Sequence, residues 1–88
     1  MSKDTKIIGR KVYPNGNILN IGPGEYGRVR GIWFACPPGH PELIANLKRH
    51  KVMEHPGGTI TVSPSIEVSN RTDYFHGHLK HGVWSECK

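Results

Sequence analysis

Alternation of apolar and polar residues is clearest between Thr59 and Ser69. In this segment the apolar side chains fall on every second position, at Ile60, Val62, Ile66 and Val68. A period of two predicts a half-buried β-strand. Pro64 falls on the apolar side of the pattern and cannot donate a ladder hydrogen bond, so we expect an edge position or a bulge there.

The next segment, "DYFHGHLKHGVWSEC" (residues 73–87), predicts a β-hairpin with His81-Gly82 as its two-residue turn. Counting outward from this turn places His78 opposite Ser85 and His76 opposite Cys87. Alternation then predicts two different faces. The polar face holds Tyr74, His76, His78, Ser85 and Cys87. The apolar face, which should enter the core, holds Phe75, Leu79 and Trp84.

Elsewhere, 11 Gly and 7 Pro residues divide the chain into short elements, which favours strands joined by turns. Strands are predicted at 6–13 ("KIIGRKVY"), 18–21 ("ILNI") and 28–36 ("RVRGIWFAC"). Turns or loops are predicted at 14–17, 22–27, 37–41 and 55–58. Residues 42–51 ("ELIANLKRHK") fit either a two-turn helix or a strand, and we favour a strand over 42–47 that returns beside "IWFAC".

These elements predict a mostly β protein, a small single-domain sandwich or partly open barrel of about six short strands with a C-terminal β-hairpin. We expect residues 1–5 to form a flexible N-terminal tail and residues 6–88 to form one β-rich domain. The chain has 88 residues, of which 35% are hydrophobic, and this is enough for one small core.

No apolar run approaches the length of a membrane span, and the N-terminus lacks the apolar stretch of a signal peptide. We therefore expect a soluble, cytoplasmic protein with no membrane partner. In that compartment Cys36 and Cys87 should be free thiols, although a disulfide between them is an open alternative.

The formal net charge of +5 favours attraction to nucleic acid or to acidic proteins. The basic residues are spread along the chain, which is equally typical of a charge that serves solubility. The one dense group is Lys48, Arg49 and Lys51, a candidate patch for nucleic acid or a protein partner.

The last third of the chain concentrates the residue types of a hydrolytic site. A serine nucleophile needs a neighbouring base, which in turn is oriented by a carboxylate. The candidate nucleophiles are Ser63 and Ser65, the candidate bases His76 and His78, and the candidate carboxylates Asp73, Glu67 and Glu86. The chain has no Gly-x-Ser-x-Gly elbow, and serines on a polar strand face are often only solvated.

A zinc site is a second hypothesis. Cys36 and His40 are separated by three residues, and His76 or His78 with Cys87 can complete a tetrahedral Cys/His set. The set that we predict is Cys36, His40, His76 and Cys87. The chain has no Cys-x-x-Cys, and the alternative is that Cys36 packs as a small core residue.

Three stretches, "GPGEYGRVRGIWFACPPG", "GTITVSPSI" and "FHGHLKHGVW", resemble a family of small phage- and prophage-encoded proteins of unknown function. Its marks are a Thr-x-Ser-Pro-Ser-Ile strand and a His-Gly-x-Leu hairpin. Larger relatives look like accessory proteins of bacterial ubiquitin-like conjugation systems, for which a peptidase role is suggested. Many carry a Cys-rich zinc knuckle, of which this chain retains only Cys36 and His40.

The resemblance implies a phage or prophage accessory protein that acts in the host cytoplasm. We predict Ser65 as the nucleophile, because it follows the bend expected at Pro64, and His76 as the base, because it matches the family motif. Asp73 or Glu67 would orient His76. The leading hypothesis is thus a Ser/His hydrolase of peptide-like bonds. The alternative is a non-catalytic binding module, with or without a zinc staple, that acts on a host protein or nucleic acid.

Overall fold

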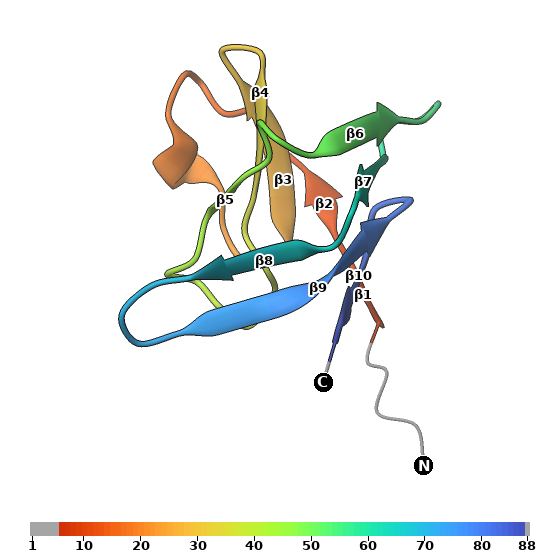
Figure 1. Ribbon diagram of the computed structural model, residues 1–88. Coiled ribbons are helices and arrows are strands. Elements are labelled where there is room, and N and C mark those ends of the chain that lie inside the picture. The colour runs from red at the N-terminus through yellow and green to blue at the C-terminus, as the bar shows by residue number, and fades with distance from the viewer. Residues whose placement is uncertain (1–5, 88) are drawn as a thin grey trace.

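The structure is a computed structural model that describes residues 6–87, so the predicted tail at residues 1–5 lies outside the described residues (Figure 1). Residues 6–87 form ten β-strands and one short 3-10 helix, η1 (Ile18–Asn20). The strands are β1 (Lys6–Ile8), β2 (Arg10–Lys11), β3 (Glu25–Val29), β4 (Ile32–Ala35), β5 (Ala45–Asn46), β6 (Lys51–Glu54), β7 (Ile60–Ser63), β8 (Ile66–Ser69), β9 (Tyr74–Lys80) and β10 (Val83–Glu86).

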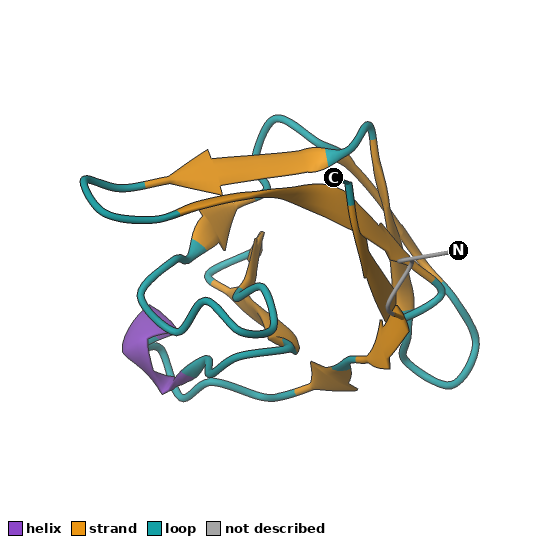
Figure 2. Ribbon diagram, turned by 90° about the horizontal axis from the view of Figure 1, so that it is seen from below, coloured by secondary structure: helices purple, strands orange, loops and turns teal. Residues whose placement is uncertain are grey.

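The strands form three sheets around one core, in an arrangement that is not a closed barrel (Figure 2). The first sheet has the order β1-β10-β9-β8, the second has the order β2-β3-β4-β5, and the third pairs β6 with β7. Within these sheets β2 and β3 run parallel, and the other neighbours are antiparallel. The predicted mostly β fold is confirmed, although the described chain contains ten short strands rather than about six.

The C-terminal hairpin has the predicted register. Lys80 lies opposite Val83, and His78 lies opposite Ser85. His81 and Gly82 have φ angles of 49° and 76°, the left-handed values that a type I′ turn requires at both central residues. The residues predicted for the apolar face of this hairpin, Phe75, Leu79 and Trp84, are all buried.

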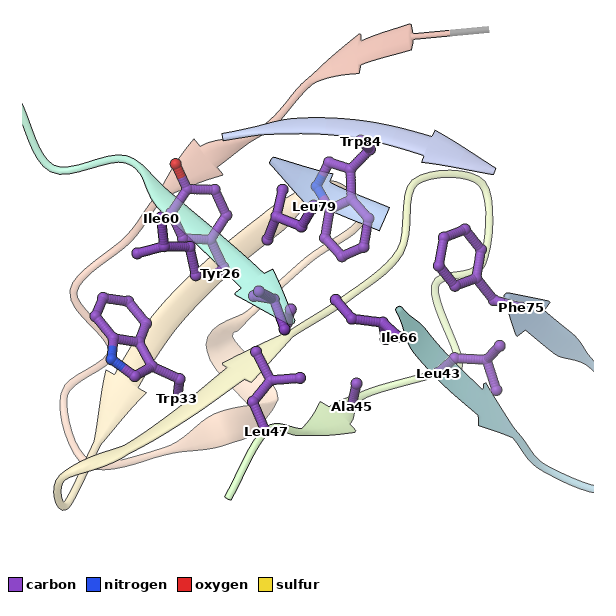
Figure 3. Packing of buried hydrophobic residues seen from close by; sticks show 12 residues of the cluster. Tyr26, Trp33, Leu43, Ala45, Leu47, Ile60, Ile66, Phe75, Leu79 and Trp84 are labelled. Atoms are coloured by element: carbon purple, nitrogen blue, oxygen red, sulfur yellow. The ribbon is translucent and has the colours of Figure 1, made fainter. Parts of the chain in front are cut away.

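One cluster of buried side chains joins the three sheets (Figure 3). Its largest members are aromatic, and Phe75 meets Trp84 edge to face with ring centroids 5.6 Å apart. The indole N–H of Trp84 donates to the carbonyl of Gly24 at 3.0 Å, so its polar atom is satisfied. The cluster comprises Tyr26, Trp33, Ala35, Leu43, Ala45, Leu47, Ile60, Val62, Ile66, Phe75, Leu79 and Trp84.

The strand predicted between Thr59 and Ser69 is two strands rather than one. β7 pairs with β6 of the third sheet, whereas β8 pairs with β9 of the first. The chain therefore changes sheets at Pro64, and no bulge within a single strand is needed to accommodate this proline. The apolar phase continues across the break, because Ile60, Val62 and Ile66 are all buried.

Three further predictions need correction. Residues 28–36 are not one strand, because a second turn of left-handed residues, Arg30 and Gly31, separates β3 from β4. The loop predicted at 22–27 is shorter than expected, because β3 already begins at Glu25. Residues 18–20 are helical because the Asn17 side chain accepts a hydrogen bond from the backbone N–H of Leu19, which caps this turn.

Two other segments keep their β character in shorter form. The strand predicted at 6–13 is divided at Gly9 into β1 and β2, which belong to different sheets. Within 42–47 only Ala45–Asn46 is a strand, and it lies beside β4 as expected. Within residues 6–87 the structure contains no helix with the length and apolar character that crossing a bilayer requires.

Candidate active site

Ser65 and His76 lie side by side at the edge of the first sheet. The hydroxyl oxygen of Ser65 is 2.9 Å from Nε2 of His76, and both residues are half-buried. This separation is within the range in which an imidazole can take a proton from a hydroxyl. When Nε2 carries no hydrogen, the Ser65 hydroxyl donates to it. Of the serines and histidines that the sequence nominates, the structure brings these two together.

The local fold explains this contact. Ser65 lies between β7 and β8, just after Pro64, where the chain leaves one sheet and enters another. His76 is in β9, directly opposite Glu67 of β8. Alternation along the two strands places Ser65 and His76 on the side of the sheet that faces away from the core, since Ile66 and Phe75 are buried on the other side.

A second imidazole holds the backbone of Ser65. Nε2 of His50 lies 3.1 Å from the Ser65 carbonyl oxygen. A carbonyl only accepts hydrogen bonds, so Nε2 of His50 carries the hydrogen and donates it to Ser65. Nδ1 of His50 is buried and has no hydrogen-bond partner among the described residues. His50 was not among the predicted site residues, because no periodic pattern relates its loop to Ser65.

The predicted carboxylates do not orient His76. Asp73 instead accepts a hydrogen bond from Nδ1 of His40 at 2.8 Å, together with one from the backbone N–H of Tyr74. These two bonds lower the pKa of the Asp73 carboxyl below its ordinary value. No residue that the structure describes forms a hydrogen bond with Nδ1 of His76. The role that we predicted for Asp73 is therefore not supported by its contacts.

Glu67 is also engaged elsewhere. Its carboxylate accepts a hydrogen bond from the Tyr74 hydroxyl at 2.7 Å. This bond is the main cause of the raised pKa of Tyr74, because the neutral phenol is the form that donates. The third candidate, Glu86, lies 3.6 Å from Nε2 of His40. The arrangement is thus a serine–histidine pair in which His76 has no carboxylate hydrogen-bonded to it within residues 6–87.

The other candidates lie apart from this pair. Ser63 is exposed at the end of β7, opposite Lys51, and forms no hydrogen bond with a described histidine. His78 is exposed on β9 opposite Ser85 and has no contact with Ser65 among those that the structure describes.

The predicted zinc ligands do not converge. Nδ1 of His40 is occupied by Asp73, and the Cys36 thiol contacts the backbone carbonyls of Pro37 and His40, at 3.9 Å and 3.5 Å, rather than a predicted ligand side chain. Burial raises the pKa of the Cys36 thiol to about 11, which disfavours the thiolate that binds zinc. Cys87 meets His76 through its backbone N–H. In the described part of the chain no group of three or more His, Cys, Asp or Glu residues is arranged to hold a metal ion.

Cys36 therefore behaves as the small core residue that was the alternative to a zinc ligand. It is fully buried, whereas Cys87 is exposed, and both are free thiols rather than partners in a disulfide.

The dense basic group forms a separate surface. Lys48 and Arg49 line a shallow pocket of about 310 Å³ with Asn46 and His50. Neither of these cations, nor Lys51, forms an ion pair with a described residue. In contrast, Arg10, Lys11 and Arg28 are paired with Glu25 or Glu54.

No protein-family model, no curated protein and no solved structure matches this chain.

Proposed function

We propose that the protein is a small hydrolase of peptide-like bonds in which Ser65 is the nucleophile and His76 the base. The single observation that carries this proposal is the 2.9 Å separation between the Ser65 hydroxyl and Nε2 of His76. Nε2 would take the hydroxyl proton as the Ser65 oxygen attacks the carbonyl carbon of the scissile bond. The resulting imidazolium would return this proton to the leaving group as the acyl-enzyme forms, and a water activated by His76 would then release the acid.

The environment of Ser65 supports this role. The residue lies outside both strand ladders, and its hydroxyl is on the solvent side of the sheet. The hydrogen bond from His50 fixes its backbone without using the hydroxyl. A nucleophile that is held by its neighbours in this way needs little reorganisation before attack.

Among residues 6–87 the pair has no carboxylate in the place of the third member of a serine triad. An aspartate in that position holds the imidazole in the correct tautomer and stabilises its protonated form. We therefore expect slow turnover, with His76 still responsible for activating Ser65.

Covalent labelling with a fluorophosphonate tests the proposal directly, because this reagent phosphonylates activated serines. We expect the mass increase to map to Ser65 and to vanish in Ser65→Ala. The matched control is Ser63→Ala, which removes an exposed serine two residues away and should leave the label in place. Absence of label on Ser65 in the folded protein would reject the proposal.

A non-catalytic binding module is the second candidate. The observation that favours it is the pocket at Lys48 and Arg49, whose charges have no described ion-pair partner. Such a surface suits the phosphates of nucleic acid, and binding should weaken steeply with salt. Loss of single-stranded oligonucleotide binding in Lys48→Gln/Arg49→Gln, with no labelling of Ser65, would favour this candidate. The phage or prophage origin that the motifs imply stays a prediction.

A further inference from the structure

A pocket of about 370 Å³ lies on the outer face of the first sheet, over β1, β10 and β9, which are neighbours in Figure 1. Its size is at the lower end of the range for small-molecule sites. The described lining residues are Lys6, His78, Lys80, Val83 and Ser85. The hydrolytic chemistry proposed for Ser65 and His76 uses none of them.

The register of the three strands brings these side chains together. Ser85 of β10 lies opposite both Lys6 of β1 and His78 of β9, so the three residues form one row across the sheet. Val83 lies opposite Lys80 in the next row on the same face. Side chains that are presented by paired strands keep their spacing better than side chains on loops.

The charged side chains among the described residues that line this pocket are all basic. Two ammonium groups, an imidazole and a hydroxyl face the cavity, and none of its described lining residues is acidic. Neither Lys6 nor Lys80 forms an ion pair with a described residue. Three other cations, Arg10, Lys11 and Arg28, each have a glutamate within 3.3 Å. The pocket is therefore a site where an oxygen anion would neutralise charge and accept several hydrogen bonds.

We infer that this pocket binds an oxyanion, a carboxylate or phosphate group, between Lys6, Lys80, His78 and the Ser85 hydroxyl. Val83 supplies an apolar surface for the part of the ligand next to the charged group.

The position of the pocket suggests that a bound anionic group anchors the substrate of Ser65. His78 follows His76 by two residues on β9, and both are on the side away from the core. Two residues of a strand span about 7 Å. A ligand whose anionic group binds at His78 can thus place its scissile bond about 7 Å away, beside Ser65. This step rests on the proposed function, and it names the substrate class as acyl compounds with a carboxylate or phosphate close to the scissile bond.

Nuclear magnetic resonance titration of Ser65→Ala protein with sodium phosphate and with sodium acetate tests anion binding without any turnover. We expect saturable shifts of the Val83 and Ser85 amides and of the His78 ring. Lys6→Gln/Lys80→Gln should weaken the affinity about tenfold or more, since hydrogen bonds to charged groups are being lost. The tighter of the two anions identifies the phosphate or carboxylate class.

The matched control is Arg30→Gln/Arg71→Gln, which removes two positive charges from exposed positions outside the pocket lining and should change the affinity less than about twofold. Equal weakening by both double variants, or no saturation up to about 0.1 M anion, where screening dominates, would overturn the inference. Anion binding without labelling of Ser65 would reject only the proposed function. Labelling of Ser65 without anion binding would reject only the pocket.

Discussion

Glu67 lies directly opposite His76 in the β8–β9 ladder, yet its carboxylate accepts a hydrogen bond from the hydroxyl of Tyr74 and none from His76. Proximity between two strands thus does not pair the acid with the imidazole. The carboxylate of a serine triad would lie next to His76, but the Glu67 carboxylate is hydrogen-bonded to the Tyr74 hydroxyl instead.

Replacing Glu67 should consequently matter little for the reactivity of Ser65. We expect Glu67→Gln to keep the rate of fluorophosphonate labelling within about threefold of the parent protein, because no contact with His76 is lost. The measurement is the pseudo-first-order labelling rate followed by intact mass. A large loss of rate would show that Glu67 reaches His76 during the reaction.

Replacing His76 should slow the reaction of Ser65 much more than replacing Glu67. General-base catalysis contributes roughly 10²–10⁴-fold, so His76→Ala should slow ester hydrolysis by at least about 100-fold. Ser65→Ala should have a comparable effect, and the double variant should be no slower than the more damaging single variant, because the two residues act as a unit. Multiplicative losses would indicate that they act independently.

The two cysteines should differ in reactivity. Burial raises the pKa of the Cys36 thiol to about 11, and the charge of Glu25 adds to this effect. At about pH 8 Cys36 is therefore almost entirely protonated, whereas Cys87 is exposed to reagent. Iodoacetamide should modify Cys87 alone in the folded protein and both thiols in guanidinium chloride, as read by peptide mass spectrometry. Equal modification under folding conditions would contradict this assignment.

Asp73 should make the stability of the fold depend on pH in the acidic range. The hydrogen bonds from His40 and Tyr74 lower the pKa of Asp73 in the folded state below its ordinary value of 3.8. Its stabilising effect is therefore fully present above the ordinary pKa and is lost as the pH falls through the lowered folded value. Asp73→Asn should lower the Tm at neutral pH, and the difference from the parent should shrink in acid. Glu42→Gln, an exposed carboxylate without a described ion pair, should show no such trend.

Gly77 should not tolerate a side chain. A Cβ atom there would meet the carbonyl oxygen of Ser85 and approach Cζ of Phe75 to 2.5 Å. We expect Gly77→Ala to lower the free energy of unfolding by about 1–3 kcal/mol, the usual range for overpacking. Gly22→Ala, whose nearest contact would be the Glu25 carboxylate at 3.5 Å, should change it by less than about 0.5 kcal/mol. Urea unfolding of both variants gives the comparison.

Alternation along the sequence predicted correctly which side of each strand is buried, but it did not predict which strands pair with one another. Strict alternation around His81-Gly82 was enough to place His78 opposite Ser85, because the turn sets the register of both strands. The same kind of pattern between Thr59 and Ser69 concealed a change of sheet at Pro64. Alternation reports which side of a strand is buried, and β7 and β8 bury the same side although they pair with different strands.

Contacts between residues far apart in the chain leave no pattern in the local sequence from which they could be predicted. The turn at Arg30-Gly31 resembles His81-Gly82 but was hidden because the apolar run after it looked like a continuation of the same strand. The hydrogen bond between His40 and Asp73 joins residues far apart in the chain, and we had predicted His40 as a zinc ligand and Asp73 as a catalytic carboxylate. Lys6 entered the anion pocket unpredicted, since only the pairing of β1 with β10 brings it there.

The three strands β8, β9 and β10 are consecutive in the chain, whereas β1 completes their sheet from the far end of the described residues. Contacts between sequence neighbours form faster than contacts that close a long loop. In the order of folding events, Ser65 and His76 should therefore meet early, within the local meander. The row of Lys6, Ser85 and His78 should assemble late, because β1 can pair with β10 only after the chain between them has been brought together.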